Sequence, residues 1–370
     1  MKNTFGSAVT LTIFGESHGP AIGAVLDGIA PGIPVDEAYI AAQMDKRRAR
    51  GGLSTARKEA DAVRFLSGVW QGHTTGTPIA LMIENNNARS GDYDKTKDLL
   101  RPGHADYTAH AKYQGWQDPR GGGHFSGRIT AAVVAAGALC QSILAGHGIQ
   151  AGTHVARCAG IEDEPFEQDA TLLREQLRQV NAMQELAVLD EGAAEKMRGA
   201  VLAAAAEGDS VGGLLETAVL GLPAGVGEPY FDSVEGVLSH LLFSIPAVKG
   251  VEFGLGFGLA NLPGSRANDP FCLRDGKIAT VTNHNGGING GITNGMPLVL
   301  RTVIKPTPSI YKTQQTVDYA SMQPALLNIE GRHDPCILHR ARVVQDSVVA
   351  FGLLDLLTQR YGTLWQGEGL

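Results

Sequence analysis

Residues 119–136 read PRGGGHFSGRITAAVVAA, a triple glycine followed closely by an apolar run. The apolar run predicts a helix, and the glycines before it predict a turn whose backbone N–H groups a ligand can approach closely. A helix N-terminus carries about half a positive charge, and the guanidinium groups of Arg120 and Arg128 match the oxygens of a phosphate or carboxylate. This stretch therefore predicts a helix that begins at a site for a phosphorylated, anionic ligand.

A second stretch just upstream, RPGHADY at residues 101–107, adds Arg101 and His104 to the same region. These residues also have a structural interpretation: Ser126 suits a helix N-cap, glycines suit turns, and His104 and His110 suit a polar loop. For any single residue the structural interpretation is the more common one. The recurrence of the same residue types in three further places favours the binding interpretation.

Three more clusters combine glycine with histidine, hydroxyl or basic side chains. The first closes the alternating run Val9–Phe14, which predicts a half-buried strand. The second precedes a predicted strand, Leu298–Ile304, and the third precedes a predicted helix, Val344–Gln359. The clusters are GESHGP (15–20), NHNGGINGGITNG (283–295) with KPTPS (305–309), and GRHDPC (331–336).

Composition sets broad limits on the class of protein. With 370 residues the chain can bury a large core. Its 48 glycines are about 13% of the residues, nearly twice the usual share of roughly 7%. The net charge of −7 argues against a general nucleic-acid binder.

The cysteines lack C-x-x-C spacing, which suggests neither a zinc site nor a disulfide framework. No signal-peptide core and no run of about 18 apolar residues is visible, so a reducing cytoplasm is the expected location, without membrane association.

Local patterns predict further helices and strands. The predicted elements are a helix at Asp36–Arg48 with an N-cap aspartate, strands at Ala21–Leu26 and Ile79–Ile83, and two helices within residues 169–207 broken near Asp190. Asp232-Ser233-Val234-Glu235 has the spacing of a capping box before another helix. Because the candidate site residues run from position 17 to position 334, we expect one intertwined α/β domain over residues 1–370.

Taken together, the four clusters and the segments between them resemble the chorismate synthase family. The likeness extends from about Gly6 to Leu357 and includes LSGVWQGHTTGTPIA (66–80) and AVKGVE (247–252) in the family's order. The resemblance implies conversion of 5-enolpyruvylshikimate 3-phosphate into chorismate and phosphate, the last common step of the shikimate pathway for aromatic amino acids. It also implies reduced FMN (FMNH2) as cofactor, a homotetramer, and an α/β (α+β) fold in which helices lie between antiparallel sheets in a β-α-β sandwich. Some members also reduce the flavin with NADPH, which the residues of this chain do not decide.

The implied chemistry is a 1,4-elimination, in which phosphate leaves one carbon and a proton leaves another carbon further along the ring. The reaction needs a proton donor, a base and an electron-rich partner, and reduced flavin can donate electron density and take it back. By the family's pattern, His18 protonates the departing phosphate and His104 protonates or holds the reduced flavin, tasks that suit a pKa near neutrality. Asp334, with Ser17 and Ser126, matches positions near flavin N5, where a relay removes the ring proton.

The resemblance also implies the residues that bind the two anions. A run of basic residues is ordinarily a solvated surface, but a substrate with a phosphate and two carboxylates beside the FMN phosphate needs several fixed cations. The expected substrate-binding residues are Arg47, Arg48, Arg50, Arg57, Arg101 and Arg128. The expected flavin-binding residues are His124, Phe125, Ser126, Ala247, Gly290, Lys305, Pro306, Thr307, Pro308, Ser309 and Arg332.

The chain departs from the commoner family form at a few of these positions. His124 and Phe125 stand where arginine and serine are frequent, Ile129 replaces a frequent glutamate, and Pro246 replaces a frequent asparagine. The basic run continues as Ala49-Arg50-Gly51-Gly52 where many members have Arg-Pro-Gly. Side-chain contacts to the flavin at positions 124, 125 and 246 therefore do not follow from the family's pattern, and contacts from the backbone there stay open.

Two other classes of function stay open. His104-x-Asp106-x-x-x-His110 together with His333 and Asp334 could ligate the metal of a phosphohydrolase, since imidazoles and carboxylates are suitable ligands. Retained activity in a chelator would oppose that interpretation. A flavin-binding protein without catalysis is the third class, favoured only if flavin binds and the substrate leaves its spectrum unchanged.

Overall fold

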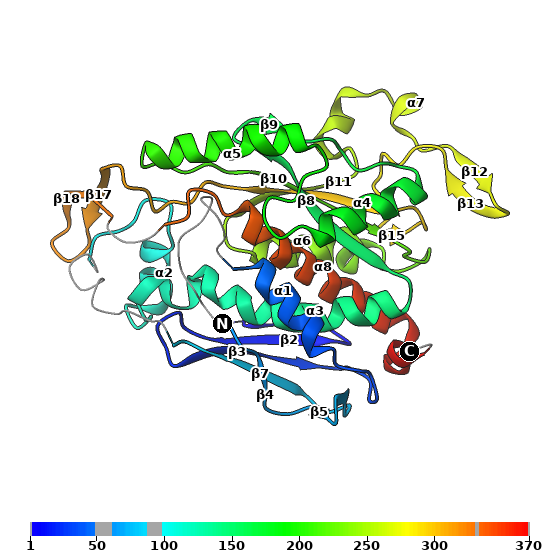
Figure 1. Cartoon of the computed structure of the whole chain (residues 1–370), viewed down its shortest axis with the longest axis horizontal. Coiled ribbons are helices and arrows are strands. Elements are labelled where there is room, and N and C mark those ends of the chain that lie inside the picture. Colours follow the sequence, from blue (N-terminus) through cyan, green and yellow to red (C-terminus); the bar gives the residue numbers. More distant parts are fainter. Residues whose placement is uncertain (1, 49–60, 87–97, 330–332, 369–370) are drawn as a thin grey trace.

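The fold consists of two antiparallel sheets with helices between them. The computed structural model describes residues 2–48, 61–86, 98–329 and 333–368, and Figure 1 shows the central helices between the two sheets. The first sheet has the order β1 (Thr4–Phe5), β2 (Thr10–Gly15), β3 (Ala21–Asp27), β7 (Ile79–Glu84), β4 (Arg64–Phe65). The second has the order β11 (Val248–Phe253), β16 (Leu298–Ile304), β10 (Gly213–Leu220), β8 (Gln150–Cys158), β9 (Ile161–Glu162). This arrangement confirms the predicted sandwich.

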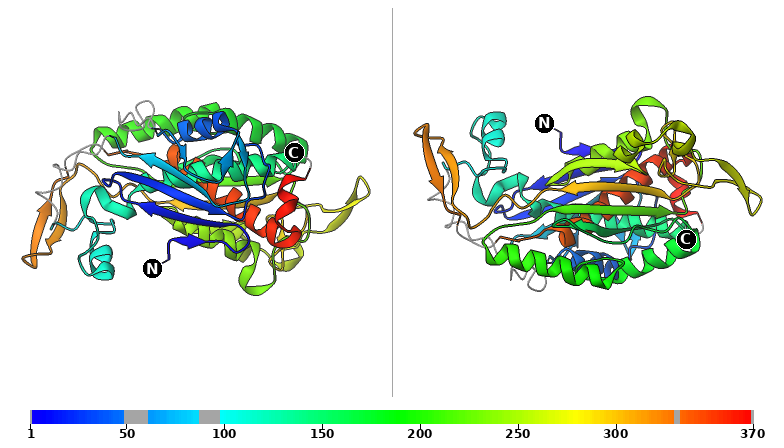
Figure 2. Two further views of the ribbon diagram at one scale, coloured as in Figure 1. Left: turned by 90° about the horizontal axis from the view of Figure 1, so that it is seen from below. Right: turned by 90° about the horizontal axis from the view of Figure 1, so that it is seen from above.

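Two long helices, α3 (Thr130–Gly146) and α8 (Leu338–Tyr361), form the layer between the sheets. α3 lies against β3 and β7, α8 lies against β8 and β10, and the two helices pack on each other, as the two further views in Figure 2 also show. α1 (Glu37–Lys46) packs beside both. The other described helices are α2 (Asp106–Tyr113), α4 (Ala170–Ala182), α5 (Glu191–Ala206), α6 (Val234–Ser244) and α7 (Gly264–Ala267). Small hairpins pair β5 (Val69–Trp70) with β6 (His73–Thr74), β12 (Phe271–Arg274) with β13 (Lys277–Thr280), β14 (Ile288–Asn289) with β15 (Ile292–Thr293), and β17 (Gln314–Asp318) with β18 (Gln323–Leu327).

A glycine lets the two central helices approach closely. A Cβ built on Gly137 of α3 would lie 2.3 Å from the Cβ of Ser347 on α8, so no larger residue fits at this crossing without movement. The helical stretch Gly127–Gly146 is long and apolar enough to span a membrane, but 67% of its apolar window is buried inside the protein. It is therefore a core helix, and one hydrophobic cluster joins it to buried residues from Val9 to Leu357.

A buried carboxylate on α8 fixes the segment that leads into β2. Asp355 accepts hydrogen bonds from the backbone N–H groups of Ser7, Ala8 and Val9 at 2.8 to 3.2 Å. A buried polar group costs free energy unless it is paired, and here the bonds satisfy both the carboxylate and the backbone. The position of β2 matters because its far end carries Ser17 and His18.

Most local predictions are confirmed. The predicted strands Val9–Phe14, Ala21–Leu26, Ile79–Ile83 and Leu298–Ile304 correspond to β2, β3, β7 and β16. Asp36 caps α1 by accepting a hydrogen bond from Tyr39 N–H at 2.9 Å. The two helical patterns within residues 169–207 form α4 and α5, separated by residues 183–190.

The predicted capping box at Asp232–Glu235 is wrong by one residue. Ser233 is the N-cap of α6, and its Oγ accepts a hydrogen bond from Gly236 N–H at 2.9 Å. Asp232 belongs to the preceding 3₁₀ turn, so the chain becomes helical later and Glu235 stands one position too early to close the box. α8 also begins before the predicted Val344, because buried Leu338 extends its apolar face.

A buried histidine links β8, β10 and the segment after β9. His154 Nδ1 lies 2.7 Å from Asp163 Oδ2, and its Nε2 lies 3.0 Å from Glu216 Oε2. Burial alone lowers the pKa of His154, but the hydrogen bonds to the two carboxylates outweigh it, and the pKa is raised above its ordinary value. As an imidazolium the ring donates to both carboxylates, so its charge stabilises the folded state.

We expect this histidine to make stability depend on pH on the alkaline side. A folded-state pKa above the unfolded value of roughly 6.5 gives stabilisation that is complete below that pH and is lost as the pH rises through the folded value. His154→Gln should lower the free energy of unfolding by about 3–5 kcal/mol near pH 6, because it leaves two buried carboxylates without their cation. Urea unfolding from pH 6 to pH 9 measures this, and the exposed His73→Gln is the control. An unaltered pH profile in His154→Gln would contradict the assignment.

Candidate functional site

A turn of three left-handed glycines organises the site. In the 3₁₀ segment η3 (Arg120–Phe125), the consecutive glycines Gly121–Gly123 have φ of +61°, +99° and +53°, a region that side chains disfavour. Ser17 N–H donates to the carbonyl of the third glycine at 3.1 Å. His124 Nδ1 lies 2.8 Å from the carbonyl oxygen of Gly15. The loop after β2 and the start of α3 are thereby fixed to each other.

The same glycines let two histidines approach the backbone. A Cβ built on Gly121 would lie 2.1 Å from Cε1 of His18, and a Cβ on Gly122 would lie 3.2 Å from Cε1 of His104. Ser17 Oγ lies 3.3 Å from His18 Nδ1. The structure thus brings three predicted catalytic residues together on one turn, although they come from segments far apart in the sequence.

A network of charged hydrogen bonds holds His104 in place. Its Nδ1 lies 2.9 Å from Asp106 Oδ1, and Arg101 donates to the same carboxylate through Nε at 2.9 Å and Nη2 at 2.6 Å. Although burial raises the pKa of Asp106, the hydrogen bonds from Arg101 and His104 outweigh it and hold the pKa well below its usual range. An ionised Asp106 accepts a hydrogen bond from Nδ1–H, which leaves Nε2 as the ring nitrogen available for proton exchange. Arg101, expected to bind substrate, is bidentate to Asp106 here.

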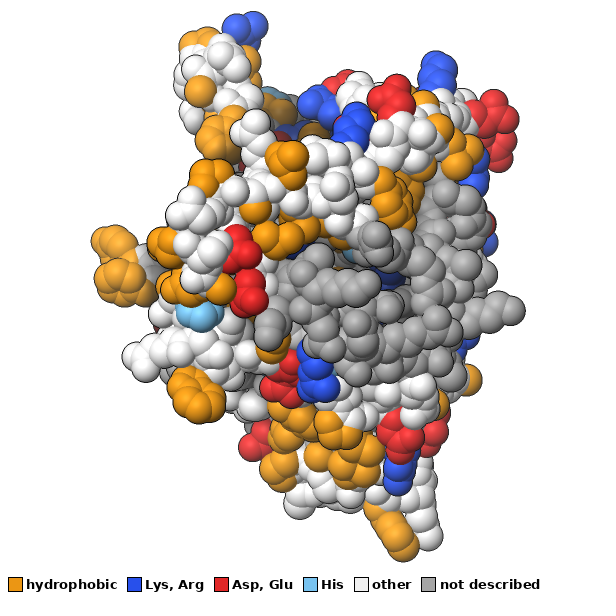
Figure 3. Space-filling model, turned by 90° about the vertical axis from the view of Figure 1, so that its left-hand side faces the viewer, with side chains coloured by type: hydrophobic (Ala, Val, Ile, Leu, Met, Phe, Trp, Pro, Cys, Tyr) orange, Lys and Arg blue, Asp and Glu red, His pale blue; other side chains and the backbone are white. Residues whose placement is uncertain are grey.

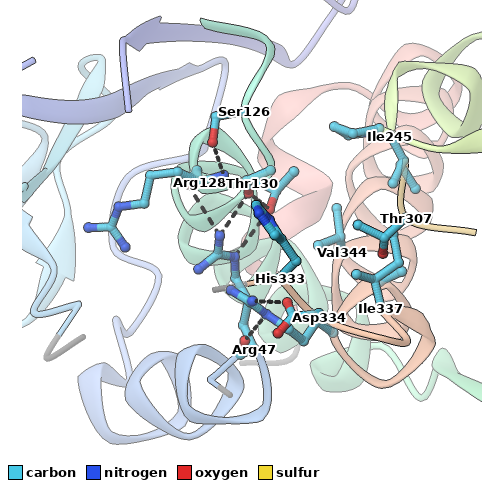
Figure 4. Close-up of a pocket in the computed structure, with 14 residues that line it drawn as sticks. Arg47, Ser126, Arg128, Thr130, Ile245, Thr307, His333, Asp334, Ile337 and Val344 are labelled. Carbon is cyan, nitrogen blue, oxygen red and sulfur yellow. Dashed lines mark hydrogen bonds and ion pairs between the residues drawn. The ribbon is translucent and has the colours of Figure 1, made fainter. Parts of the chain in front are cut away.

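Beside the glycine turn lies a cavity of about 270 Å³ with one polar and one apolar side (Figure 4). Its polar side includes Arg47, Ser126, Arg128 and Asp334, and its apolar side includes Ile245, Ile337 and Val344. Ser126 joins the cavity to the turn, because a Cβ on Gly122 would lie 3.8 Å from the Ser126 Cβ. Ser126 Oγ also accepts a hydrogen bond from Arg128 N–H at 3.2 Å, so this serine both caps the helix start and lines the cavity.

A buried carboxylate pairs two of the predicted substrate arginines. Asp61 Oδ2 lies 3.3 Å from Arg47 Nη1, and its Oδ1 accepts a hydrogen bond from Arg128 Nη1. Arg47 also donates to Thr130 Oγ1 at 3.1 Å and to the Gly127 carbonyl at 2.7 Å, which ties the end of α1 to the start of α3. The side chains of Arg47 and Asp61 are only 3% and 1% exposed. Charges so deeply buried require this mutual compensation.

The segment Lys305–Ser309 reaches the same region from the second sheet. Lys305 N–H donates to the Ala247 carbonyl at 3.0 Å, and Lys305 Nζ donates to the Gly103 carbonyl, next to His104. Pro308 lies against Gly103, where a Cβ would be 3.3 Å from the Pro308 Cβ. Thr307 lines the cavity with its hydroxyl buried and without a hydrogen-bond partner among the residues that the structure describes. Ser309 is also buried, and Pro306 precedes Thr307 in this segment.

Gly290, an expected flavin contact, lies apart from the cavity. It is in the β14–β15 turn, where the carbonyl of the adjacent Gly291 accepts a hydrogen bond from Val234 N–H at the start of α6. α6 has 11 residues and is therefore about 16 Å long, and the cavity residue Ile245 follows its opposite end. Within the described part of one chain, Gly290 is not brought to the cavity.

Other expected contacts have local partners or fall outside the described residues. Arg48 Nη1 lies 2.9 Å from Asp45 Oδ1. Phe125 is 37% exposed and packs edge-on against Tyr113 with ring centroids 6.0 Å apart. The expected contacts that lie outside the described residues are Arg50, Arg57 and Arg332.

The face that carries α2 and the β17–β18 hairpin exposes large apolar side chains among scattered charges (Figure 3). Trp116 and Leu326 are 91% and 65% exposed. His110 on α2 packs against Tyr319 with ring centroids 4.2 Å apart.

Among the described residues no group of three or more His, Cys, Asp or Glu side chains could hold a metal ion. The metal alternative therefore lacks a ligand set in this part of the chain.

Several cavity residues had not been singled out by the sequence reasoning. Arg340 lines the cavity with a charged side chain, and Ile245, Ile337 and Val344 supply apolar contacts. Asp61 lies outside the cavity lining and pairs with the cavity residues Arg47 and Arg128. Ile337 and Val344 are seven residues apart, which is about two helical turns. A predicted helix starting near Leu338, instead of at Val344, would have placed both residues on one face. Asp61 and Arg340 carry no local signal, because each acts on partners in other elements.

Comparison with known proteins finds relatives over nearly the whole length. A sequence profile of chorismate synthase matches residues 9–358. The chorismate synthase of Pyrococcus abyssi (strain GE5 / Orsay) is 46% identical over 355 residues, covering 96% of this chain and 97% of that protein. The chorismate synthase of Thermococcus kodakarensis is 44% identical over 362 residues, covering 98% and 99%. A crystal structure of a chorismate synthase matches with a TM-score of 0.76 at 28% identity, covering 97% of this chain and 94% of the other.

Alanine at the glycines of the turn should lower stability in a defined order. Gly123→Ala should cost about 2–4 kcal/mol, because its Cβ would lie 2.2 Å from the Asp118 carbonyl oxygen in a conformation that side chains avoid. Gly121→Ala should cost about 1–2 kcal/mol for the left-handed conformation, since the His18 ring can move away from the new methyl group. Gly127→Ala, whose Cβ meets nothing within 4 Å, is the matched control. Urea unfolding that ranks Gly123→Ala with Gly127→Ala would contradict this account of the turn.

Proposed function

Because the chain belongs to the chorismate synthase family, we propose that the glycine turn and the adjoining cavity together bind reduced FMN and 5-enolpyruvylshikimate 3-phosphate. The chain is a phosphate-eliminating lyase with chorismate synthase activity, which completes the shikimate pathway. The observation that carries the proposal is that the His18 ring lies against Gly121 and the His104 ring lies against the next residue, Gly122, beside the cavity. Ser126 belongs to both the turn and the cavity lining, so both ligands would share one continuous site.

The cavity fits a flavin in its chemistry. Its apolar residues, such as Ile245 and Val344, suit the ring system, and its polar residues suit the heteroatoms at the ring edge. The buried Thr307 hydroxyl has no partner among the described atoms and would gain one from the cofactor. Lys305 supplies a cation for a phosphate, and the glycine turn lets a phosphate approach the backbone closely. When bound, reduced FMN supplies transient electron density to the substrate while phosphate leaves.

The protein's own groups perform the proton transfers. His18 donates a proton to an oxygen of the departing phosphate, and Ser17 Oγ, 3.3 Å from its Nδ1, orients the ring. Asp106 holds His104 through Nδ1, so Nε2 would be the ring nitrogen available to bound FMN. Asp334, with Ser126 on the same polar side of the cavity, belongs to the relay that takes the proton from the substrate ring.

The cations around the site hold the substrate's phosphate and two carboxylates. Arg47 and Arg128 lie together because Asp61 pairs with both, and the net positive charge of the three groups remains available to an anion. Arg48, Arg101 and the arginines at 50 and 57 complete the expected set. Arg332 and the segment Lys305–Ser309 are expected to serve the cofactor.

We also propose that the whole chain, residues 1–370, acts as one domain in a cytoplasmic homotetramer. Support for a single domain comes from the hydrophobic cluster that spans Val9 to Leu357. Support for assembly comes from large exposed apolar side chains, which are costly to leave in water. They include Tyr230, Phe231, Phe257, Phe271, Leu273 and Ile278, which are 71 to 95% exposed. Light scattering of the purified protein measures the mass of the assembly.

The direct test of the shared site uses purified protein under anaerobic conditions. Photoreduced FMN and 5-enolpyruvylshikimate 3-phosphate should give chorismate and phosphate. The substrate's charges should draw the basic residues over the flavin and tighten FMN binding, and by reciprocal linkage FMN should tighten substrate binding by the same factor. Equal FMN affinity with and without substrate would oppose the shared site. A parallel reaction with oxidised FMN and NADPH decides whether the chain reduces its own flavin.

Removing the imidazole of His18 should slow the reaction without weakening FMN binding. His18→Ala should lower turnover by roughly 10²- to 10⁴-fold, the usual contribution of a positioned general acid, while FMN affinity stays nearly constant. Single-turnover chorismate formation and FMN titration measure the two effects. Unimpaired turnover in a folded His18→Ala protein would leave this histidine with a structural role alone.

Asp334→Asn separates the elimination from the metal alternative. The amide keeps the shape and one hydrogen bond of Asp334 but cannot accept a proton, so turnover should fall by about 10²-fold or more while substrate and FMN still bind. A lost metal ligand would instead leave activity that added Mg²⁺, Mn²⁺ or Zn²⁺ restores in part. Metal rescue, or full turnover without metal, would defeat the assignment of Asp334 to the relay.

A further inference from the structure

One arginine of the cavity was not expected from the sequence. Arg340 is the third residue of α8 and lines the cavity beside Asp334. Its Nη1 lies 2.7 Å from Asp334 Oδ2, and its Nε donates to the Arg47 carbonyl at 3.0 Å. A single side chain therefore connects the start of α8, the loop before it and the end of α1, three segments that meet at the cavity.

The position of this arginine is unfavourable for the helix itself. The first turn of a helix has unpaired N–H groups and a positive partial charge, so a cation there is repelled. The N-cap of α8, Ile337, has no side chain that could cap these groups. Pairing with Asp334 and with a carbonyl at the negative end of α1 offsets the repulsion. These two partners fix the orientation of Arg340, and Arg340 in turn restricts the carboxylate.

A neighbouring arginine on α8 provides a contrast within the same helix. Arg342 is fully buried, and its Nη1 donates to the Val180 carbonyl at 3.1 Å at the end of α4. Burial lowers the pKa of His339 to about 4, so the residue before Arg340 is neutral near pH 7. Of the two arginines, Arg340 is the one whose guanidinium meets the cavity, with its side chain 24% exposed.

We propose that Arg340 is a positioning residue for Asp334 and holds this carboxylate at the cavity in the orientation that proton removal from the substrate ring requires. The inference rests on the proposed role of Asp334 in the elimination. It follows that loss of Arg340 acts on the chemical step through Asp334 and has little effect on the affinity for substrate.

A double-mutant cycle tests this directly. Arg340→Met removes the cation but keeps a long apolar stem, and it should lower kcat by about 10- to 100-fold, the usual effect of misplacing a reacting group, with KM changed far less. In the Asp334→Asn background the same substitution should cost little more, because its target is already disabled. Added guanidinium ion should restore part of the turnover of Arg340→Met and none of that of the double variant.

Two further variants control for folding. Arg340→Lys keeps the charge, but a lysine cannot bond to Asp334 and to the Arg47 carbonyl with a planar fork, so its kcat should be intermediate. Arg360→Met removes an exposed arginine from the other end of α8 and should match the wild type. Equal thermal unfolding of the variants shows that α8 is intact.

The outcomes separate the inference from the function on which it rests. If the wild-type protein makes no chorismate, the proposed function and the inference fall together. If it does, and Asp334→Asn is impaired, then additive losses in the double variant, a rise in KM alone, or wild-type kcat in Arg340→Lys would overturn the role of Arg340. Non-additive losses in kcat with guanidinium rescue are the result that the inference predicts.

Discussion

Close approach of side chains to the backbone at Gly121–Gly123 is the constraint on which the site depends. The ring of His18 lies against Gly121, and the ring of His104 lies against Gly122. The carbonyl of Gly123 accepts a hydrogen bond from Ser17 N–H. No residue with a Cβ could occupy the first position without displacing the His18 ring. The sandwich supports this arrangement, because β2 carries His18 to the turn while α3, which begins just after it, is anchored between the two sheets.

Charge pairing sets the second condition for the site. The arginines near the cavity lie against carboxylates: Arg47 and Arg128 against Asp61, Arg101 against Asp106, and Arg340 against Asp334. Each pair fixes a guanidinium that would otherwise be mobile, at the cost of neutralising part of its charge. If these arginines bind the substrate as proposed, its three anionic groups would meet cations that are already oriented. This is the form of preorganisation by which an enzyme lowers the cost of ordering its own groups during the reaction.

Local patterns predicted individual helices and strands, the family resemblance supplied the sandwich and the candidate site residues, and long-range pairs account for what both missed. Alternation over Val9–Phe14 and the Asp36 cap are properties of neighbouring residues, so β2 and α1 could be predicted. The capping box failed at Ser233 because a 3₁₀ turn took up Asp232, which propensity alone does not reveal. Asp61 and Arg340 act on partners in other elements, and His154 pairs with carboxylates on other strands and loops. The family's pattern supplied His18, His104 and Asp334, whose separate roles no spacing rule indicates.

We propose that one site, built on the glycine turn and the adjoining cavity, holds both ligands. A crystal structure of the protein with oxidised FMN and 5-enolpyruvylshikimate 3-phosphate tests it most directly. We expect the substrate phosphate within hydrogen-bond distance of His18, and the flavin ring against the apolar side of the cavity at Ile245 and Val344, with its N5 facing the substrate ring near Asp334. A flavin bound away from this cavity, or a substrate phosphate out of reach of His18, would contradict the account.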